Sequence, residues 1–248
     1  MVVCGGTLGI FMATALQRRG FRVCVVERGP LRGRAQEWNI SRKELKELVV
    51  QGVLGEEDVV AAVAIDFNPI RVGFVGEDGP FEFFTRDILH LGVSPGVLLE
   101  RAKQRFLAAG GVVRDNTPIK GVRVAPNGAA VDVTGEAEAI TGRLVIDCMG
   151  NQSPISRQHR WGQRPDGICI VVGTCAAGFA PEKNTYADLM YSFTPTQWAR
   201  GGDKNSQVQY FWEAFPASSG PGDRTTYMFQ VRCVSCVLSG MEEWGMAG

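Results

Sequence analysis

The sequence lacks the features that mark membrane-spanning, disulfide-rich or nucleic-acid-binding proteins. No run of 18 apolar residues occurs in its 248 residues, so no membrane-spanning helix is predicted. Basic and acidic residues both number 26, and a formal net charge of zero favours neither nucleic acid nor an anionic membrane surface. The seven cysteines are odd in number and widely spaced, which indicates reduced thiols rather than a disulfide framework.

The chain also shows no internal repeat, and no signal or transit segment precedes the first strand-like residues. Cys233 and Cys236 form a close pair, but no second pair completes a zinc site, so they are interpreted as strand cysteines and no metal site is predicted. With 45% apolar and 21% charged residues, the composition is that of a globular protein. The length allows one large domain, or one and a half, with a core that needs no disulfides.

The first 27 residues predict one strand–helix–strand unit. Residues 1–4 are a short apolar strand, and 5–9 are a glycine turn. Residues 10–19 have helical spacing and end at Gly20, and 21–27 form a continuous apolar run typical of a buried parallel strand. Together they indicate a βαβ unit.

The turn in this unit resembles the glycine fingerprint of dinucleotide-binding proteins, with Cys4 in place of the first glycine. Gly6 lets the backbone approach a pyrophosphate, and Gly9 lets the helix pack closely on the strand. The free N–H groups and positive dipole end of the helix then face the phosphates. The cofactor-binding residues expected here are Cys4, Gly5, Gly6, Thr7, Leu8 and Gly9.

An acidic residue ends the second strand at close to the separation where a carboxylate accepts from ribose hydroxyls. This residue is Glu27, and it favours FAD or NAD over NADP. The neighbouring Arg28 could suggest the 2′-phosphate of NADP, with simple solvation as the alternative, and Glu27 and Arg28 are both counted among the expected cofactor-binding residues.

Beyond this unit, residues 43–62 read as helical in two pieces. Ser94 and Pro95 predict a helix start, and that helix extends to about residue 109. Short strands are expected at 63–86 as an antiparallel excursion, at 111–114, 121–125 and 129–134 as a small meander, at 142–147, and from 167 onward.

Two segments favour FAD over NAD. Arg32, Arg34 and Arg42 follow Glu27 in a loop where a guanidinium can pair with the FAD pyrophosphate. Residues 144–157, LVIDCMGNQSPISR, resemble the Asp-Gly segment of flavin enzymes. The similarity is to the glutathione-reductase-like branch that holds para-hydroxybenzoate hydroxylase, geranylgeranyl reductase and the plant lycopene cyclases.

In several longer segments the amino-acid sequence is similar to a plant and algal set of FAD/NAD(P)-binding oxidoreductase-like proteins related to lycopene cyclase. The segments that support this resemblance are GRAQEWNISRKEL, DCMGNQSPISRQ and QYFWEAFPASSGPGDRTTYMF. The resemblance covers roughly residues 1–230. It implies an α/β fold with a Rossmann-type, glutathione-reductase-like FAD-binding domain and a partial antiparallel-sheet substrate domain. It also implies a chloroplast location and adds Asp147 and Gly150 to the cofactor-binding residues.

The expected domains are 1–160 for FAD, with the strand excursion at about 63–90, and 161–248 for substrate. Lycopene cyclases carry a Phe-x-Glu-Glu-Thr motif, of which residues 211–213 share Phe-x-Glu. Glu213 is therefore a candidate catalytic acid or polar anchor, or else a strand-edge carboxylate in solvent. The aromatic density of residues 208–229 suggests an apolar small-molecule substrate such as an isoprenoid, and peripheral membrane contact stays open.

The superfamily carries a later Gly-Asp segment near the flavin, which is not found before residue 248, so a truncated gene product is expected. Three functions stay open: an FAD-dependent oxidoreductase, a flavin monooxygenase with NAD(P)H as electron donor, and a non-catalytic remnant. The sequence does not specify the oligomeric state.

Overall fold

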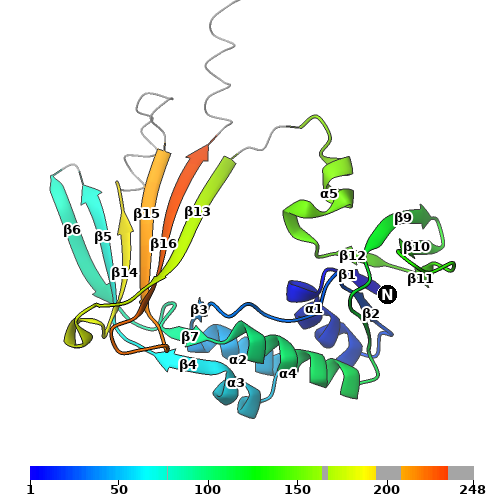
Figure 1. Ribbon diagram of the computed structural model, residues 1–248, viewed down its shortest axis with the longest axis horizontal. Coiled ribbons are helices and arrows are strands. Elements are labelled where there is room, and N and C mark those ends of the chain that lie inside the picture. Colours follow the sequence, from blue (N-terminus) through cyan, green and yellow to red (C-terminus); the bar gives the residue numbers. More distant parts are fainter. Residues whose placement is uncertain (77, 164–166, 194–207, 234–248) are drawn as a thin grey trace, which may run out of the picture. The chain divides into compact units, whose positions relative to one another are not determined.

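The computed structural model describes residues 1–76, 78–163, 167–193 and 208–233, and the chain divides into two compact units (Figure 1). Unit 1 contains Met1–Trp38, Lys43–Val63 and Val93–Gly162, and unit 2 contains Asn39–Arg42, Ala64–Gly92 and Gln163–Gly248. The chain thus passes between the units several times. The excursion expected inside the FAD-binding domain at 63–90 is instead mostly part of unit 2, because its two longest strands join the sheet of that unit.

Unit 1 is built on a parallel sheet of order β12-β1-β2-β8. Its strands are β1 (Val2–Cys4), β2 (Cys24–Val26), β8 (Val112–Arg114) and β12 (Val145–Asp147). The expectation that 111–114 belongs to the meander is wrong, since β8 pairs in parallel with β2. The long connection between β2 and β8 ends in the helix Pro95–Ala108, which returns the chain so that β8 runs in the same direction as β2.

Two long helices pack together in unit 1, namely α1 (Gly6–Arg18) and α4 (Pro95–Ala108). The Thr14 hydroxyl donates to the carbonyl of Ala102 at 3.3 Å, and the Gln17 amide donates to that of Ala109 at 2.9 Å. Helix α1 begins at Gly6, earlier than expected, because most of the glycine turn is already helical.

The start of α4 confirms the sequence prediction. The Ser94 hydroxyl accepts from the Val97 amide at 3.3 Å, and Pro95 occupies the first turn. The expected two-piece helical segment is also confirmed as α2 (Arg42–Val50) and α3 (Glu56–Ala62). A short helix, α5 (Pro154–His159), follows β12.

The meander of unit 1 consists of β9 (Ile119–Ala125), β10 (Gly128–Val133) and β11 (Ile140–Gly142). Its Val131 and Val133 pack with Val2, Cys4 and Val26 of the parallel sheet in one buried cluster. The meander therefore covers one face of the strands that lead into the glycine turn.

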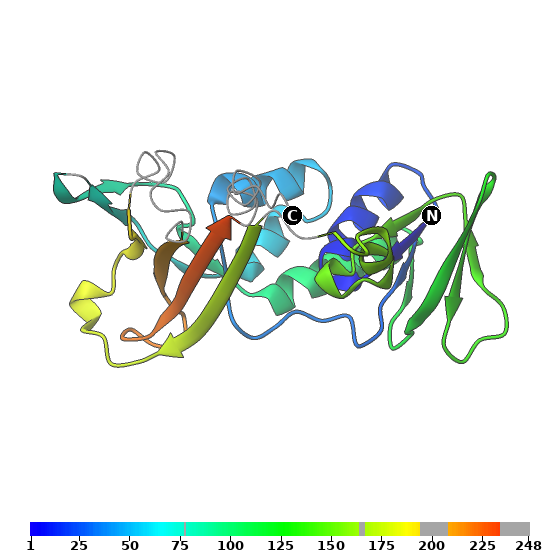
Figure 2. The same cartoon turned by 90° about the horizontal axis from the view of Figure 1, so that it is seen from above.

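Unit 2 contains a six-stranded sheet of order β13-β16-β15-β14-β5-β6 (Figures 1 and 2). The strands are β5 (Ile70–Gly76), β6 (Gly79–Thr85), β13 (Gly167–Ala176), β14 (Ala187–Tyr191), β15 (Val208–Pro216) and β16 (Arg224–Cys233). All neighbours are antiparallel except β5 and β14, so the expected antiparallel sheet is in fact mixed. A separate three-stranded sheet has the order β3-β7-β4, from β3 (Trp38–Ile40), β7 (Leu91–Val93) and β4 (Val63–Asp66).

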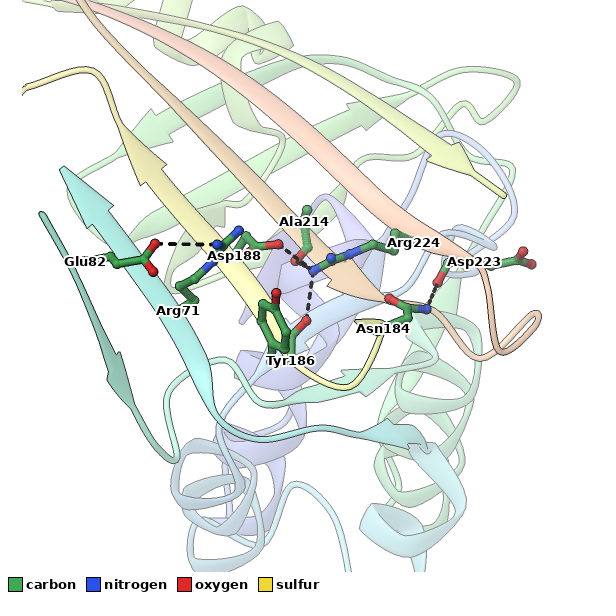
Figure 3. Close-up of polar contacts among 8 residues, drawn as sticks. All are labelled: Arg71, Glu82, Asn184, Tyr186, Asp188, Ala214, Asp223 and Arg224. Carbon is green, nitrogen blue, oxygen red and sulfur yellow. Dashed lines mark hydrogen bonds and ion pairs between the residues drawn. The ribbon is translucent and has the colours of Figure 1, made fainter. Parts of the chain in front are cut away.

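A polar network ties the middle strands of the unit 2 sheet together (Figure 3). The Asp188 carboxylate of β14 pairs with Arg71 of β5 at 2.7 Å and with Arg224 of β16 at 3.0 Å. Arg224 is 6% exposed and also donates to the carbonyls of Tyr186 and Ala214. Because a buried cation needs a partner, this network holds the sheet in one register.

Candidate functional site

The glycine turn of unit 1 is held by backbone hydrogen bonds from both neighbouring strands. The Gly5 amide donates to the Val26 carbonyl at 2.9 Å, and the Cys148 amide donates to the Cys4 carbonyl at 2.7 Å. Gly5 has a φ of +96°, and a Cβ atom there would lie 2.5 Å from the Cys148 carbonyl oxygen. Only glycine fits this position.

The other two glycines permit close packing. A Cβ at Gly6 would lie 2.8 Å from Cγ of Leu31, and one at Gly9 would lie 2.8 Å from a methyl group of Val3. Gly9 thus brings α1 against β1, the role expected for the last glycine of the fingerprint. Cys4 is fully buried in the strand, so its side chain packs in the core.

Glu27 lies directly beside this turn. One carboxylate oxygen accepts from the Gly6 amide at 2.6 Å, and the other accepts from the Gly29 amide at 3.2 Å. A negative charge at the positive end of α1 is electrostatically favourable. The turn, the helix start and the acidic strand end thus form one arrangement, as the sequence predicted.

A pocket of about 530 Å³ opens on this arrangement. Seven of the predicted residues line it, namely Gly5, Gly6, Thr7, Leu8, Glu27, Arg28 and Gly150. Leu8 is 68% exposed at this lining. The lining residues that the sequence analysis missed are Val26, Pro118, Ile119, Cys148, Met149, Gln152 and Pro154.

The order of the strands in the sequence could have predicted some of these additional lining residues. Cys148, Met149, Gln152 and Pro154 follow β12, which runs parallel to β1 in register Cys4 with Asp147. The carboxyl ends of parallel strands meet at one edge of a sheet, where ligands of open α/β sheets bind. No comparable signal marks Pro118 and Ile119, since they come from the start of the meander.

Asp147 acts on the shape of the pocket rather than on its lining. Its carboxylate accepts from the Met149 amide at 3.0 Å and from the Ser153 hydroxyl. It therefore holds the turn that carries Met149 and Gly150 against the glycine turn.

The predicted arginines do not gather at the pocket lining, apart from Arg28. Arg32 and Arg34 are exposed, and Nε of Arg34 donates to the Gln36 carbonyl at 3.3 Å. Between them, a Cβ at Gly33 would lie 2.3 Å from the Pro95 carbonyl carbon, so this loop crosses the start of α4. Arg42 belongs to unit 2 and pairs there with Asp66 at 2.5 Å, so its role toward a pyrophosphate stays a prediction.

The thiols near the pocket are kept in the neutral form. Burial, followed by the charge of Asp147, raises the pKa of Cys4 to about 12. Burial and then Asp147 also raise the pKa of Cys148. Thiols of this kind are poor nucleophiles, so their role is packing. Cys236 of the C-terminal pair lies outside the described residues.

A larger hollow of about 1080 Å³ lies at the opposite, amino end of the same strands. It is lined by residues such as Arg22, Arg123 and Arg143 and contains no fingerprint residue. The smaller pocket is the candidate site, because it alone of these two joins the glycine turn to Glu27. In the described part of the chain, no group of three or more His, Cys, Asp or Glu side chains is placed to bind a metal ion.

In unit 2, Glu213 lies beside a row of stacked aromatic rings. Cross-strand pairing places one aromatic ring on each of five neighbouring strands of the sheet. The centroids of adjacent rings are 4.2–5.5 Å apart. The aromatic row consists of Phe81, Phe74, Tyr191, Phe211 and Phe229.

Glu213 follows Phe211 by two residues on β15, so both side chains point to the same face of the sheet. Burial raises the pKa of the Glu213 carboxyl, which therefore keeps its proton to higher pH than an exposed glutamate. Burial, and then the charge of Glu213, raises the pKa of Tyr191 as well. Glu213 is thus half-buried among aromatic side chains rather than free at a strand edge.

No family model matches the chain, and no curated protein is significantly similar in sequence. Solved structures do match. The peptidyl tryptophan dihydroxylase QhpG, essential for tryptophylquinone cofactor biogenesis, is 15% identical with a TM-score of 0.55, over 94% of this chain and 46% of that chain. CtdE in complex with FAD is 15% identical with a TM-score of 0.55, over 94% of this chain and 58% of that one.

A mutant of the halogenase PltM in complex with FAD is 12% identical with a TM-score of 0.64, over 92% of this chain and 50% of that chain. The chain therefore spans about half the length of the structures it matches. These likenesses show that the chain has the fold of FAD-binding flavoenzymes.

Proposed function

We propose that this chain binds FAD and belongs to an FAD-dependent oxidoreductase that acts on an apolar, isoprenoid-like small molecule. The observation that carries the proposal is the pocket in which the glycine turn, the start of α1 and Glu27 meet. The fit of a dinucleotide rests on Gly5 and Gly6, where side chains would clash and only bare backbone lines the pocket.

The residues of the pocket have distinct roles toward the adenosine diphosphate part of FAD. The amides at the start of α1, near Thr7 and Leu8, face the pyrophosphate with the positive end of the helix dipole. The Glu27 carboxylate accepts from the ribose hydroxyls, and the Arg28 guanidinium at the pocket wall adds a positive charge. Bound FAD supplies the two-electron redox chemistry, and the protein supplies binding and orientation.

The aromatic row and Glu213 support an apolar substrate. Stacked rings offer a flat apolar surface, and burial raises the pKa of the Glu213 carboxyl, which favours its uncharged form as a hydrogen-bond donor in apolar surroundings. Glu213 accordingly acts as a proton donor or a polar anchor for the substrate. The segments that resemble the plant and algal proteins support a relative of lycopene cyclase, a chloroplast location and peripheral membrane contact. No helix in the described residues is long and apolar enough to span a membrane.

The first experiment is the absorbance spectrum of the purified chain, which we expect to show bound oxidised flavin. A melting curve with and without added FAD measures the same binding by linkage, since a ligand that binds only the folded state raises the midpoint. A folded, colourless protein whose midpoint does not move with FAD would be the remnant without cofactor, and it would exclude the proposal.

A flavin monooxygenase that takes electrons from NAD(P)H is the second candidate, and the likeness to a dihydroxylase fold favours it. The two candidates differ in their use of oxygen. NADH or NADPH oxidation coupled to oxygen uptake identifies the monooxygenase, whereas substrate reduction without oxygen uptake identifies the other.

A further inference from the structure

The six-stranded sheet of unit 2 has two very different edges. At one edge, β6 contains Pro80 and Glu82, and both residue types discourage pairing with another strand. At the other edge lies β13, which pairs on its inner side with β16 over all ten residues. No described strand pairs with its outer side (Figure 2), so a row of backbone N–H and C=O groups faces outward there.

The side chains of β13 make this edge favourable for pairing. The strand reads GICIVVGTCA and contains no charged residue and no proline. Ile170, Val171 and Val172 are 54%, 48% and 58% exposed, so apolar side chains are exposed on both faces. A long, uncharged, apolar edge strand is the kind that forms a β-ladder with another strand, and soluble proteins usually protect such edges.

We propose that two copies of this chain pair through their β13 strands, antiparallel, to form one continuous sheet across a two-fold axis. A second copy fits because the strand has no charged residue, so antiparallel pairing with itself brings no like charges together. Closed two-fold pairing also removes the exposed edge from both copies at once. The axis is perpendicular to the sheet, so that each face continues into the same face of the partner.

The sequence of β13 selects the register. Side-chain faces match only if residues of the same parity are opposite each other. Two such registers give the longest overlap between the β13 strands of the two copies. In one of them Val171 lies opposite the partner's Val171 at the two-fold axis, and in the other Val172 lies opposite the partner's Val172. The ladder centred on Val171 includes both Gly167 and Gly173, whereas the ladder centred on Val172 leaves Gly167 outside. Because glycine weakens strands, the Val172 register is favoured.

This register makes a specific prediction about two exposed cysteines. Cys169 and Cys175 are free thiols on the same face of β13. A ladder centred on Val172 places Cys169 opposite the partner's Cys175, and the same pair recurs on the other side of the axis. Directly opposite residues are close enough for a disulfide between the two chains.

The test combines mass and cross-linking on the full chain. Sedimentation velocity is expected to show about twice the chain mass of 26.9 kDa. With oxidised glutathione as oxidant, two thiols lose two electrons and two protons to form an interchain disulfide, and the glutathione is reduced to two thiols. The covalent dimer should be lost in Cys169→Ser and equally in Cys175→Ser, because each bond needs one of each, and it should persist in Cys24→Ser.

Val172→Lys is the disrupting variant. It places two ammonium groups beside the axis, so the dimer should dissociate to the monomer mass, while circular dichroism confirms that an exposed position has tolerated the change. The neutral variant Val172→Thr should remain dimeric. A monomeric wild-type chain, or a dimer that survives Val172→Lys, would overturn the proposal. A cross-link that survives Cys175→Ser would overturn the register.

Discussion

The Glu27 carboxylate accepts a hydrogen bond from the Gly6 amide at 2.6 Å, which joins the end of β2 to the start of α1. Two features that lie 21 residues apart in the chain thus form one side of the candidate pocket.

Glu27→Gln should weaken FAD binding by about 10-fold, or about 1.4 kcal/mol, because an amide replaces a charged acceptor of the ribose hydroxyls. Titration of the apoprotein with FAD, followed by flavin fluorescence, measures the change. The control is Glu56→Gln, an exposed carboxylate in the first turn of α3, which should leave the affinity unaltered. If wild type, Glu27→Gln and Glu56→Gln bind FAD with equal affinity, Glu27 does not contact the cofactor.

Gly5→Ala should destabilise the chain more than Gly20→Ala. Both glycines have positive φ, of 96° and 86°, so both substitutions strain the backbone. At Gly5, however, the added Cβ would also lie 2.5 Å from the Cys148 carbonyl oxygen, whereas the space at Gly20 is open.

We therefore expect Gly5→Ala to lower the free energy of unfolding by at least about 2 kcal/mol more than Gly20→Ala. Urea denaturation followed by circular dichroism gives both values. If the two substitutions lower the free energy of unfolding equally, Gly5 does not pack against the Cys148 backbone as described.

Glu213→Gln should change how stability depends on pH. Burial raises the pKa of Glu213 in the folded chain, so the folded state holds this proton at pH values where the unfolded state has lost it. The carboxyl is therefore tolerated at acid pH, and its burial reduces stability as pH rises from the unfolded pKa through the folded one.

The glutamine variant should accordingly gain stability relative to wild type as pH rises toward neutral, with no gain at acid pH. Melting temperatures from about pH 4 to pH 8 test this, with exposed Glu182→Gln as the control. A difference that stays constant across the pH range would contradict a raised pKa of Glu213 in the folded chain.

Asp188→Ala should destabilise the chain by about 3 kcal/mol, because Arg224 is 6% exposed and would lose its carboxylate partner. The double variant Asp188→Leu/Arg224→Leu removes both charges and should recover much of that loss. Urea denaturation of Asp188→Leu, of Arg224→Leu and of the double variant gives the coupling between the two positions. Additive effects would show that the ion pair does not act as a unit.

Much of the candidate site could be predicted from the sequence because it is local. The glycine turn, the start of α1 and Glu27 belong to one βαβ unit, whose geometry follows from the order of apolar runs and glycines. The helix start at Ser94 was predictable for the same reason, since one hydroxyl and one proline specify it.

Features that depend on pairing between distant segments could not be predicted in this way. Strand periodicity shows that 111–114 and 63–86 are strands but does not show which sheet each one joins. The antiparallel pairing within 63–86 is confirmed, whereas the assignment of 111–114 to the meander is wrong. The arginines after Glu27 illustrate the same limit, since the loop places Arg42 beside Asp66.

The sequence by itself determined that an acidic strand end meets a glycine turn at a helix start, because these groups lie within one short crossover. Only the tertiary structure decided that Met149 and Ile119 line the same pocket, that Phe74 and Tyr191 extend the aromatic row beyond residues 208–229, and that β13 is an edge among the described strands. The physical reason is that register and strand order arise from side-chain packing and hydrogen bonds between segments far apart in the chain, which no local pattern records.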